Sequence, residues 1–168
     1  MFEINVFALI EVTRSALPVP FHPAAAEWFA QTFAHPTRAQ ALGWPPIARG
    51  ESTLVFAPPG SGKTLAAFVS ALDRLMFEPP PPKPRARVLY VSPLRALAVD
   101  VERNLRAPLA GIARTAARRG DVVRTLAVGI RTGDTPPAER AKMARHPPDI
   151  LITTPESLYL YLTAAKSR

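Results

Sequence analysis

The sequence contains no cysteine, which excludes disulfide bonds and gives no sign of an oxidising compartment. It also has no apolar run long enough to cross a bilayer. The opening residues 1–12 are apolar in places, but Glu3 and Glu11 interrupt them and no basic segment precedes them. They do not have the pattern of a signal peptide. The sequence therefore predicts a cytoplasmic protein without a membrane partner.

Lysine is scarce among the basic residues. Four of the 21 Lys+Arg residues are lysine, which leaves 17 arginines against 13 acidic residues and a net charge of +8. Arginine suits phosphate recognition because its planar guanidinium binds oxygen atoms in pairs. The same composition, rich in alanine, proline and arginine, is also typical of a GC-rich genome. The charge therefore permits a nucleic-acid partner without demonstrating one.

Short β-prone runs alternate with longer runs of helical periodicity. Helices are predicted at 21–33, 37–48 (broken near Pro45 and Pro46), 63–76, 94–106 with a further piece from Pro108 to 119, 135–145 and 154–162. Strands are predicted at 52–57, 88–91, 122–130 and 149–152. A proline-rich segment, 78–87, is predicted to be a surface loop. Such alternation indicates an α/β fold with a parallel, doubly wound sheet, whose ligands bind beyond the carboxyl ends of the strands.

The strongest motif is Ala-Pro-Pro-Gly-Ser-Gly-Lys-Thr at 57–64, between a predicted strand and a predicted helix. Gly60, Ser61 and Gly62 allow the backbone to approach a phosphate closely, and the helix amides point at the anion. Lys63 is expected to reach the β- and γ-phosphates, and the Thr64 hydroxyl is expected to bind Mg²⁺. Ala57 replaces the usual first glycine and Pro59 removes one amide, which predicts altered rather than lost affinity.

This motif alone fits a kinase, a transporter ATPase, a GTPase or a motor, so the neighbouring segments matter. Gln40 carries an amide that matches the N6/N7 edge of adenine, although a helical glutamine is more often solvated. Three predicted strand-to-helix turns carry groups suited to a sugar–phosphate backbone: Ser92, Pro93, Leu94 and Arg95; Thr132, Gly133 and Asp134; Thr153, Thr154 and Pro155. The simpler interpretation of each turn is a helix N-cap.

In this order, the segments resemble the first motor domain of superfamily 2 helicases, and most closely the large helicase-related (Lhr) family. Phe21-His22-Pro23, the run at 94–105 and the run at 131–135 carry that closer resemblance. It implies a RecA-like P-loop NTPase fold that binds ATP and Mg²⁺. It also implies that Gln40 reads adenine with Phe21 as a stacking partner, and that the three turns contact one nucleic-acid strand, DNA or RNA.

The resemblance divides the chain into an N-terminal extension, 1–20, and a partial ATP-binding domain, 21–168. The family's acidic motif II, which positions Mg²⁺ and water, lies beyond Arg168, as does the C-terminal helicase domain expected in cis. The run 52–57 would then lack ladder partners. An N-terminal helicase portion is the first hypothesis, and we expect the chain alone to lack catalytic residues. A remnant that binds without turnover, or another P-loop enzyme such as a kinase, is the alternative.

Overall fold

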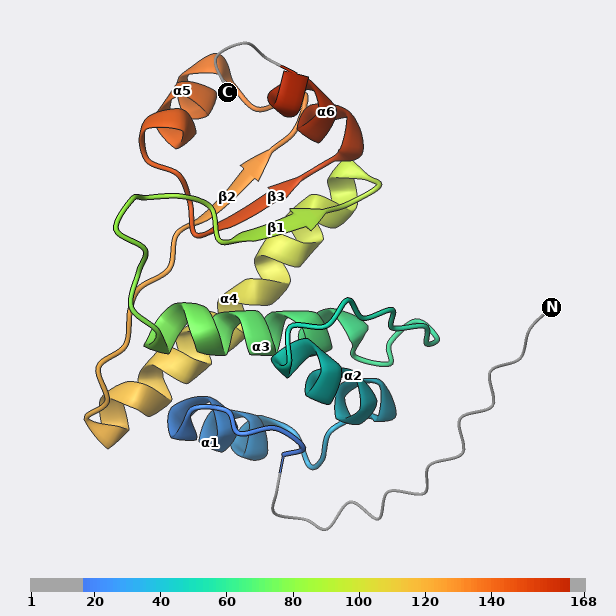
Figure 1. Cartoon of the computed structure of the whole chain (residues 1–168), viewed down its shortest axis with the longest axis vertical. Helices are drawn as coiled ribbons and strands as arrows, with labels where there is room; N and C mark the ends of the chain where they lie inside the picture. Colours follow the sequence, from blue (N-terminus) through green and yellow to red (C-terminus); the bar gives the residue numbers. More distant parts are fainter. Residues whose placement is uncertain (1–16, 164–168) are drawn as a thin grey trace, which may run out of the picture.

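The computed structural model describes residues 17–163 (Figure 1). Most of the predicted extension 1–20 therefore lies outside the described residues. The elements in chain order are α1 (Pro23–Thr32), α2 (Arg38–Ala48), α3 (Lys63–Phe77), β1 (Val88–Val91), α4 (Arg95–Arg119), β2 (Val128–Arg131), α5 (Pro137–Arg145), β3 (Ile150–Thr153) and α6 (Pro155–Thr163). None of the helices described is both long and apolar enough to cross a membrane.

The three strands form one parallel sheet in the order β1-β3-β2, which confirms the predicted α/β class. Val91 and Arg131 both lie opposite Thr153, so the strands end at the same level. Each strand is followed directly by a helix: α4, α5 and α6 respectively. The turns that begin at 92, 132 and 154 are consequently neighbours at the carboxyl edge of the sheet.

The apolar core connects the sheet to the N-terminal helices. Helix α4 packs against β2 and β3 and also contacts α3 and α1, while α2 packs against α3 (Figure 1). Trp44 of α2 is fully buried, and its indole N–H donates to Ala66 O of α3 at 2.9 Å. This bond fixes α2 beside the start of α3 because a buried indole N–H needs an acceptor.

Three prolines that were expected to interrupt helices do not end them. Helix α4 is continuous through the buried Pro108, and α2 continues through Pro45 and Pro46. A proline costs one intrahelical hydrogen bond, and the core contacts of Val101 and Ile112 on either side of Pro108 outweigh that loss.

The predicted strand at 52–57 is wrong, since this segment pairs with no strand among residues 17–163. Leu54 is 91% exposed and Phe56 is 98% exposed. A β-prone sequence forms a strand only when a ladder partner satisfies its backbone. The predicted strand at 122–130 is also too long: only Val128–Arg131 pairs with β3, and Val122 is exposed.

The pair Thr135-Pro136 predicts an N-cap followed by proline at the first helical position. Helix α5 begins one residue later, since its first residue is Pro137 and its cap is Pro136. The Thr135 hydroxyl instead accepts the Thr132 N–H at 2.8 Å and donates to Ile130 O at 3.3 Å. A side chain bonded back to the preceding turn cannot also cap the helix.

Helices α1 and α4 pack closely at Gly111, which gives a first prediction. A Cβ atom added there would lie 2.1 Å from Trp28 Nε1, whereas one added at Gly43 in α2 would lie 3.5 Å from Val55. We expect Gly111→Ala to lower the free energy of unfolding by about 1–3 kcal/mol through overpacking. Gly43→Ala, the matched control, should raise it by up to ~1 kcal/mol through helix propensity. Urea unfolding of both variants tests this; equal effects would contradict it.

Candidate functional site

The loop before α3 has the backbone that the sequence predicts. Gly62 caps the helix at φ 78° and Gly60 has φ 75°, values that residues with side chains rarely adopt. A Cβ atom at Gly62 would also lie 2.6 Å from Gln40 Nε2. Glycine is therefore required at 62 by both conformation and space. The backbone N–H groups in the first turn of α3 have no carbonyl acceptor within the helix, because no helical turn precedes them. These amides can donate hydrogen bonds to an anion.

Lys63 folds back on its own loop. Its ammonium group donates to Ala57 O and to Pro58 O, the second bond at 2.7 Å. The Ser61 N–H donates to Pro58 O at 3.3 Å, which closes the loop further. Thr64 is exposed, and its hydroxyl forms no hydrogen bond within the described part of the chain. The loop thus holds a cation at its centre, an open helix end and a free hydroxyl, which together fit a Mg²⁺-bound phosphate group.

Thr37 and Gln40 join α2 to this loop. They form a capping box: Gln40 N donates to Thr37 Oγ1 at 3.3 Å and Thr37 N donates to Gln40 Oε1 at 3.0 Å. Thr37 Oγ1 also donates to Ser61 O at 2.8 Å, and Gln40 Nε2 donates to Gly62 O at 3.4 Å. Gln40 is only 3% exposed, so its amide fixes the loop in this conformation. Its reading of adenine stays a prediction.

The sequence pattern indicates Thr37 only as a helix start and does not reveal its contact with the loop. The Thr-x-x-Gln spacing of a capping box signals the start of α2 but not the bond to Ser61. We expect Thr37→Ala to lower the free energy of unfolding by about 0.5–2 kcal/mol, because both α2 and the loop lose a hydroxyl partner. Thr37→Ser keeps the hydroxyl and serves as the control. Chemical denaturation of the two variants measures the difference, and equal stability would show that the hydroxyl has no such role.

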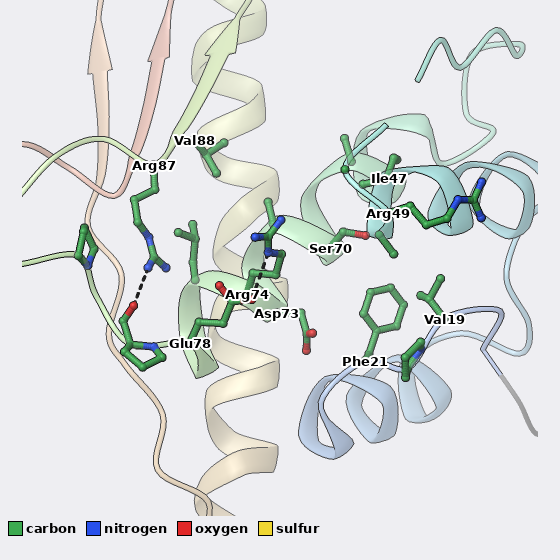
Figure 2. Close-up of a pocket in the computed structure, with 18 of the residues that line it drawn as sticks. Val19, Phe21, Ile47, Arg49, Ser70, Asp73, Arg74, Glu78, Arg87 and Val88 are labelled. Carbon is green, nitrogen blue, oxygen red and sulfur yellow. Dashed lines mark hydrogen bonds and ion pairs between the residues drawn. The ribbon is translucent and has the colours of Figure 1, made fainter. Parts of the chain in front are cut away.

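Phe21 does not meet the phosphate loop. Its ring contacts Trp44 edge-on, with centroids 5.1 Å apart. It lines a separate groove of about 960 Å³, beside α3 and the start of β1, that includes none of residues 57–64 (Figure 2). A second cavity, of about 590 Å³, lies between α2 and the segment 53–58 and is lined by Thr37 and Ser61. The structure therefore brings Gln40 to the loop but not Phe21, whose stacking on a base stays a prediction.

The hydroxyl groups at the strand ends hold the turns together. Ser92 Oγ donates to Leu94 O at 3.0 Å, Thr153 Oγ1 donates to Arg131 O at 2.6 Å, and Thr154 Oγ1 donates to Ser157 Oγ at 3.2 Å. These side chains, and Thr132, are buried. The sequence interpretation gave the hydroxyls a direct role in binding, but in this conformation they fix the backbone. The exposed residues of the three turns are Pro93, Leu94, Arg95, Gly133, Asp134 and Pro155.

Arg95 links the three turns electrostatically. Its guanidinium pairs with Asp134 at 2.5 Å, and an added Cβ at Gly133 would lie 3.0 Å from it. The Glu156 backbone N–H lowers the pKa of the Glu156 carboxyl most, followed by the Thr154 hydroxyl and the charge of Arg95. The Arg95 and Asp134 side chains are 61% and 70% exposed, so their pair contributes little stability. Arg95 can therefore exchange Asp134 for another anion at small cost.

Comparison with known proteins agrees with this geometry. Residues 37–168 match the DEAD/DEAH box helicase family. The chain is 58% identical over 145 residues to a Lhr helicase/probable uracil glycosylase of Mycolicibacterium smegmatis, covering 86% of this chain and 10% of that protein. It is 54% identical over 156 residues to the Lhr helicase/uracil glycosylase of Escherichia coli, covering 89% of this chain and 10% of that protein.

A solved structure gives the same result. The chain matches Mycobacterium smegmatis helicase Lhr bound to ssDNA and AMP-PNP with a TM-score of 0.82 and 56% identity, over 89% of this chain and 19% of that one. The fold is thus that of the RecA-like core of helicases. The chain spans about a tenth of the length of the Lhr helicases of M. smegmatis and E. coli. The chain belongs to the DEAD/DEAH box helicase family.

Proposed function

We propose that this chain is the N-terminal, ATP-binding portion of a helicase that uses ATP to move along one strand of DNA or RNA. The observation that carries the proposal is the Gly60–Thr64 loop at the start of α3 in a chain of this family. The solved relative that binds ssDNA and AMP-PNP supports it. Residues 21–168 are then part of the first motor domain, and unwinding requires the C-terminal domain in cis. A cytoplasmic location belongs to the same proposal.

In this function, the first-turn amides of α3 hold the ATP phosphates. The Lys63 ammonium leaves Ala57 O and Pro58 O and pairs with the β- and γ-phosphates, where it meets formal negative charge. Thr64 Oγ1 donates no hydrogen bond within residues 17–163 and is free to bind Mg²⁺. Bound Mg²⁺ would neutralise charge on the phosphates. Gln40 would recognise adenine by exchanging one of its present hydrogen bonds.

The nucleic-acid strand is assigned to the carboxyl edge of the sheet. Arg95 offers an exposed guanidinium, and the exposed backbone at Gly133 and Pro155 lies on the neighbouring turns. Contacts of this kind recognise phosphate and sugar groups and carry no sequence information. Ser92, Thr132, Thr153 and Thr154 then act by fixing the turns, and Pro93 and Leu94 by shaping the surface beside Arg95.

A second candidate is a protein that binds nucleotide and nucleic acid without hydrolysis. No group of three His, Cys, Asp or Glu side chains within the described residues could hold a metal ion. Asp149, a buried carboxylate, is occupied by Arg124 and the Ala127 N–H. Hydrolysis would therefore need an acidic group from outside residues 17–163.

The proposal is tested by measuring ATP hydrolysis with and without single-stranded nucleic acid, both for this chain and for a full-length protein that contains it. We expect nucleic-acid stimulation in the full-length protein alone. Binding without hydrolysis in both would favour the second candidate. Transfer of phosphate to a small molecule would instead identify another P-loop enzyme.

A further inference from the structure

The turn between β2 and α5, residues 132–135, is closed at its base by two threonines. The Thr135 N–H donates to Thr132 O at 3.2 Å, and the Thr132 N–H donates to Thr135 Oγ1 at 2.8 Å. Both threonines are buried, whereas Gly133 and Asp134 between them are exposed. The threonines therefore fix the base of the turn, and its exposed tip, Gly133 and Asp134, needs other partners to hold its shape.

Arg140 of α5 holds the carbonyl groups of this turn. Its Nε donates to Thr135 O and one of its terminal nitrogens donates to Gly133 O, both at 2.7 Å. A guanidinium group carries its donors in a fixed planar fork, so the two carbonyls are held in a fixed relation to each other. The Arg140 N–H itself donates to Pro136 O at 3.0 Å, so the helix also fixes the backbone of this residue.

The bonds to these carbonyls set the direction of the N–H groups at the tip. A trans peptide group is planar, and its C=O and N–H point to opposite sides. Because Thr132 O accepts the Thr135 N–H, the Gly133 N–H of the same peptide points away from that bond. Because Gly133 O accepts from Arg140, the Asp134 N–H points away from Arg140. Neither N–H has an acceptor within residues 17–163, and successive backbone N–H groups of a turn can bind an anion.

A second arginine, Arg95, reaches the same tip from α4. Its guanidinium pairs with Asp134, and a terminal nitrogen would lie 3.0 Å from a Cβ atom added at Gly133. The Arg95 side chain is 61% exposed, whereas Arg140 is half-buried with two of its nitrogens bonded to carbonyls. The two arginines therefore differ in what they can do: Arg95 can meet a phosphate group, and Arg140 can hold the backbone beside it.

We propose that Arg140 is a positioning residue for the nucleic-acid strand and acts through the N–H groups of Gly133 and Asp134. By holding Gly133 O and Thr135 O, it keeps these two donors directed at a phosphate group that Arg95 also contacts. A turn that is already in the binding conformation loses less entropy when the strand binds. The proposal rests on the function proposed above, in which the strand lies along the carboxyl edge of the sheet.

Arg140→Lys and Arg140→Gln separate positioning from direct contact with phosphate. Lysine keeps the charge without the planar fork, and glutamine removes the charge. In a full-length protein that contains the chain, we expect both variants to bind single-stranded DNA or RNA roughly 3- to 10-fold more weakly, with an unchanged slope of log K against log salt. Fluorescence anisotropy over a salt series measures both quantities. Full affinity in Arg140→Lys, with a reduced slope in Arg140→Gln, would identify a direct contact and overturn the proposal.

Arg145, on the same helix, provides the matched controls. Its side chain is exposed, and within the described residues it donates only to Ala141 O of its own helix, at 3.3 Å. Arg145→Lys and Arg145→Gln should leave the affinity and the salt slope close to those of the unaltered protein. An equal loss in the Arg145 variants would count against the proposal, because the loss would then be independent of the turn.

Nucleic-acid-stimulated ATP hydrolysis separates positioning from a general loss of stability. In the full-length Arg140→Lys protein, the strand concentration for half-maximal stimulation should rise by the same factor as the dissociation constant. The rate at saturating strand and the KM for ATP should not change, since the hydrogen bonds of the Arg140 side chain go to the turn and not to residues 57–64.

The possible failures of this experiment can be told apart. A parallel loss of ATP affinity would show that Arg140 only stabilises the fold, and an unchanged half-maximal concentration would show that it has no role in binding. Either result overturns the positioning role and leaves the proposed function intact. An unaltered protein that binds no single strand would instead refute the proposed function, and the positioning role with it.

Discussion

Lys63→Ala should weaken the binding of Mg·ATP by about 10- to 100-fold, as expected for the loss of charge-assisted hydrogen bonds to phosphate. The side chain starts α3 directly behind two glycines with positive φ, and its ammonium group is held at the centre of the loop by Ala57 O and Pro58 O. Those neutral carbonyls are weaker partners for a cation than a phosphate group. Isothermal titration with Mg·ATP measures the change.

Lys83→Ala is the matched control, because it removes the same charge from an exposed position in the proline-rich loop. It should leave the affinity unchanged. Urea unfolding of Lys63→Ala measures whether the protein stays stable when Ala57 O and Pro58 O lose their ammonium donor. An unchanged affinity of the folded Lys63→Ala variant would refute the assignment of the loop.

Arg95→Ala should weaken binding to a single strand by roughly 5- to 10-fold and reduce the slope of log K against log salt by about one charge. Asp134→Asn should have the opposite effect, since Asp134 now neutralises Arg95 at 2.5 Å. Fluorescence anisotropy with single-stranded DNA and RNA over a salt series measures both effects. Both variants break the same ion pair, so a purely structural role of the pair predicts equal effects on affinity. A role of Arg95 in binding predicts opposite effects.

Arg106→Ala is the control for Arg95, as Arg106 lies on the same helix and pairs with Glu102 one turn away. Its affinity and salt slope should remain close to those of the unaltered chain. If Arg95→Ala and Asp134→Asn weaken binding equally, the pair only stabilises the turns and the strand binds elsewhere.

The sequence predicted the features that depend on local chemistry. Glycine at 60 and 62 is required by backbone conformation, and the lysine that follows opens an amphipathic helix, so the loop could be placed from a few residues. The helices and the parallel class of the sheet followed from periodicity. Phe21 was assigned to the nucleotide through family resemblance alone. The structure places its ring against Trp44, and its stacking on a base stays a prediction.

Features that depend on distant partners could not be predicted in this way. The segment 52–57 has the composition of a strand but finds no ladder partner among residues 17–163. Thr153 was predicted to contact nucleic acid, and only the structure shows that its hydroxyl bonds Arg131 O, 22 positions away on the neighbouring strand. The bond from Thr37 to Ser61 joins residues 24 positions apart, and its distal partner left no pattern in the sequence.

The central claim is that this chain supplies the ATP site of a motor driven along nucleic acid. ATP hydrolysis by a full-length protein containing the chain, measured with and without single-stranded nucleic acid, tests it most directly. We expect hydrolysis that nucleic acid stimulates, and we expect Lys63→Ala to abolish that stimulated activity. Hydrolysis that does not respond to nucleic acid, or stimulation that survives Lys63→Ala, would contradict the claim.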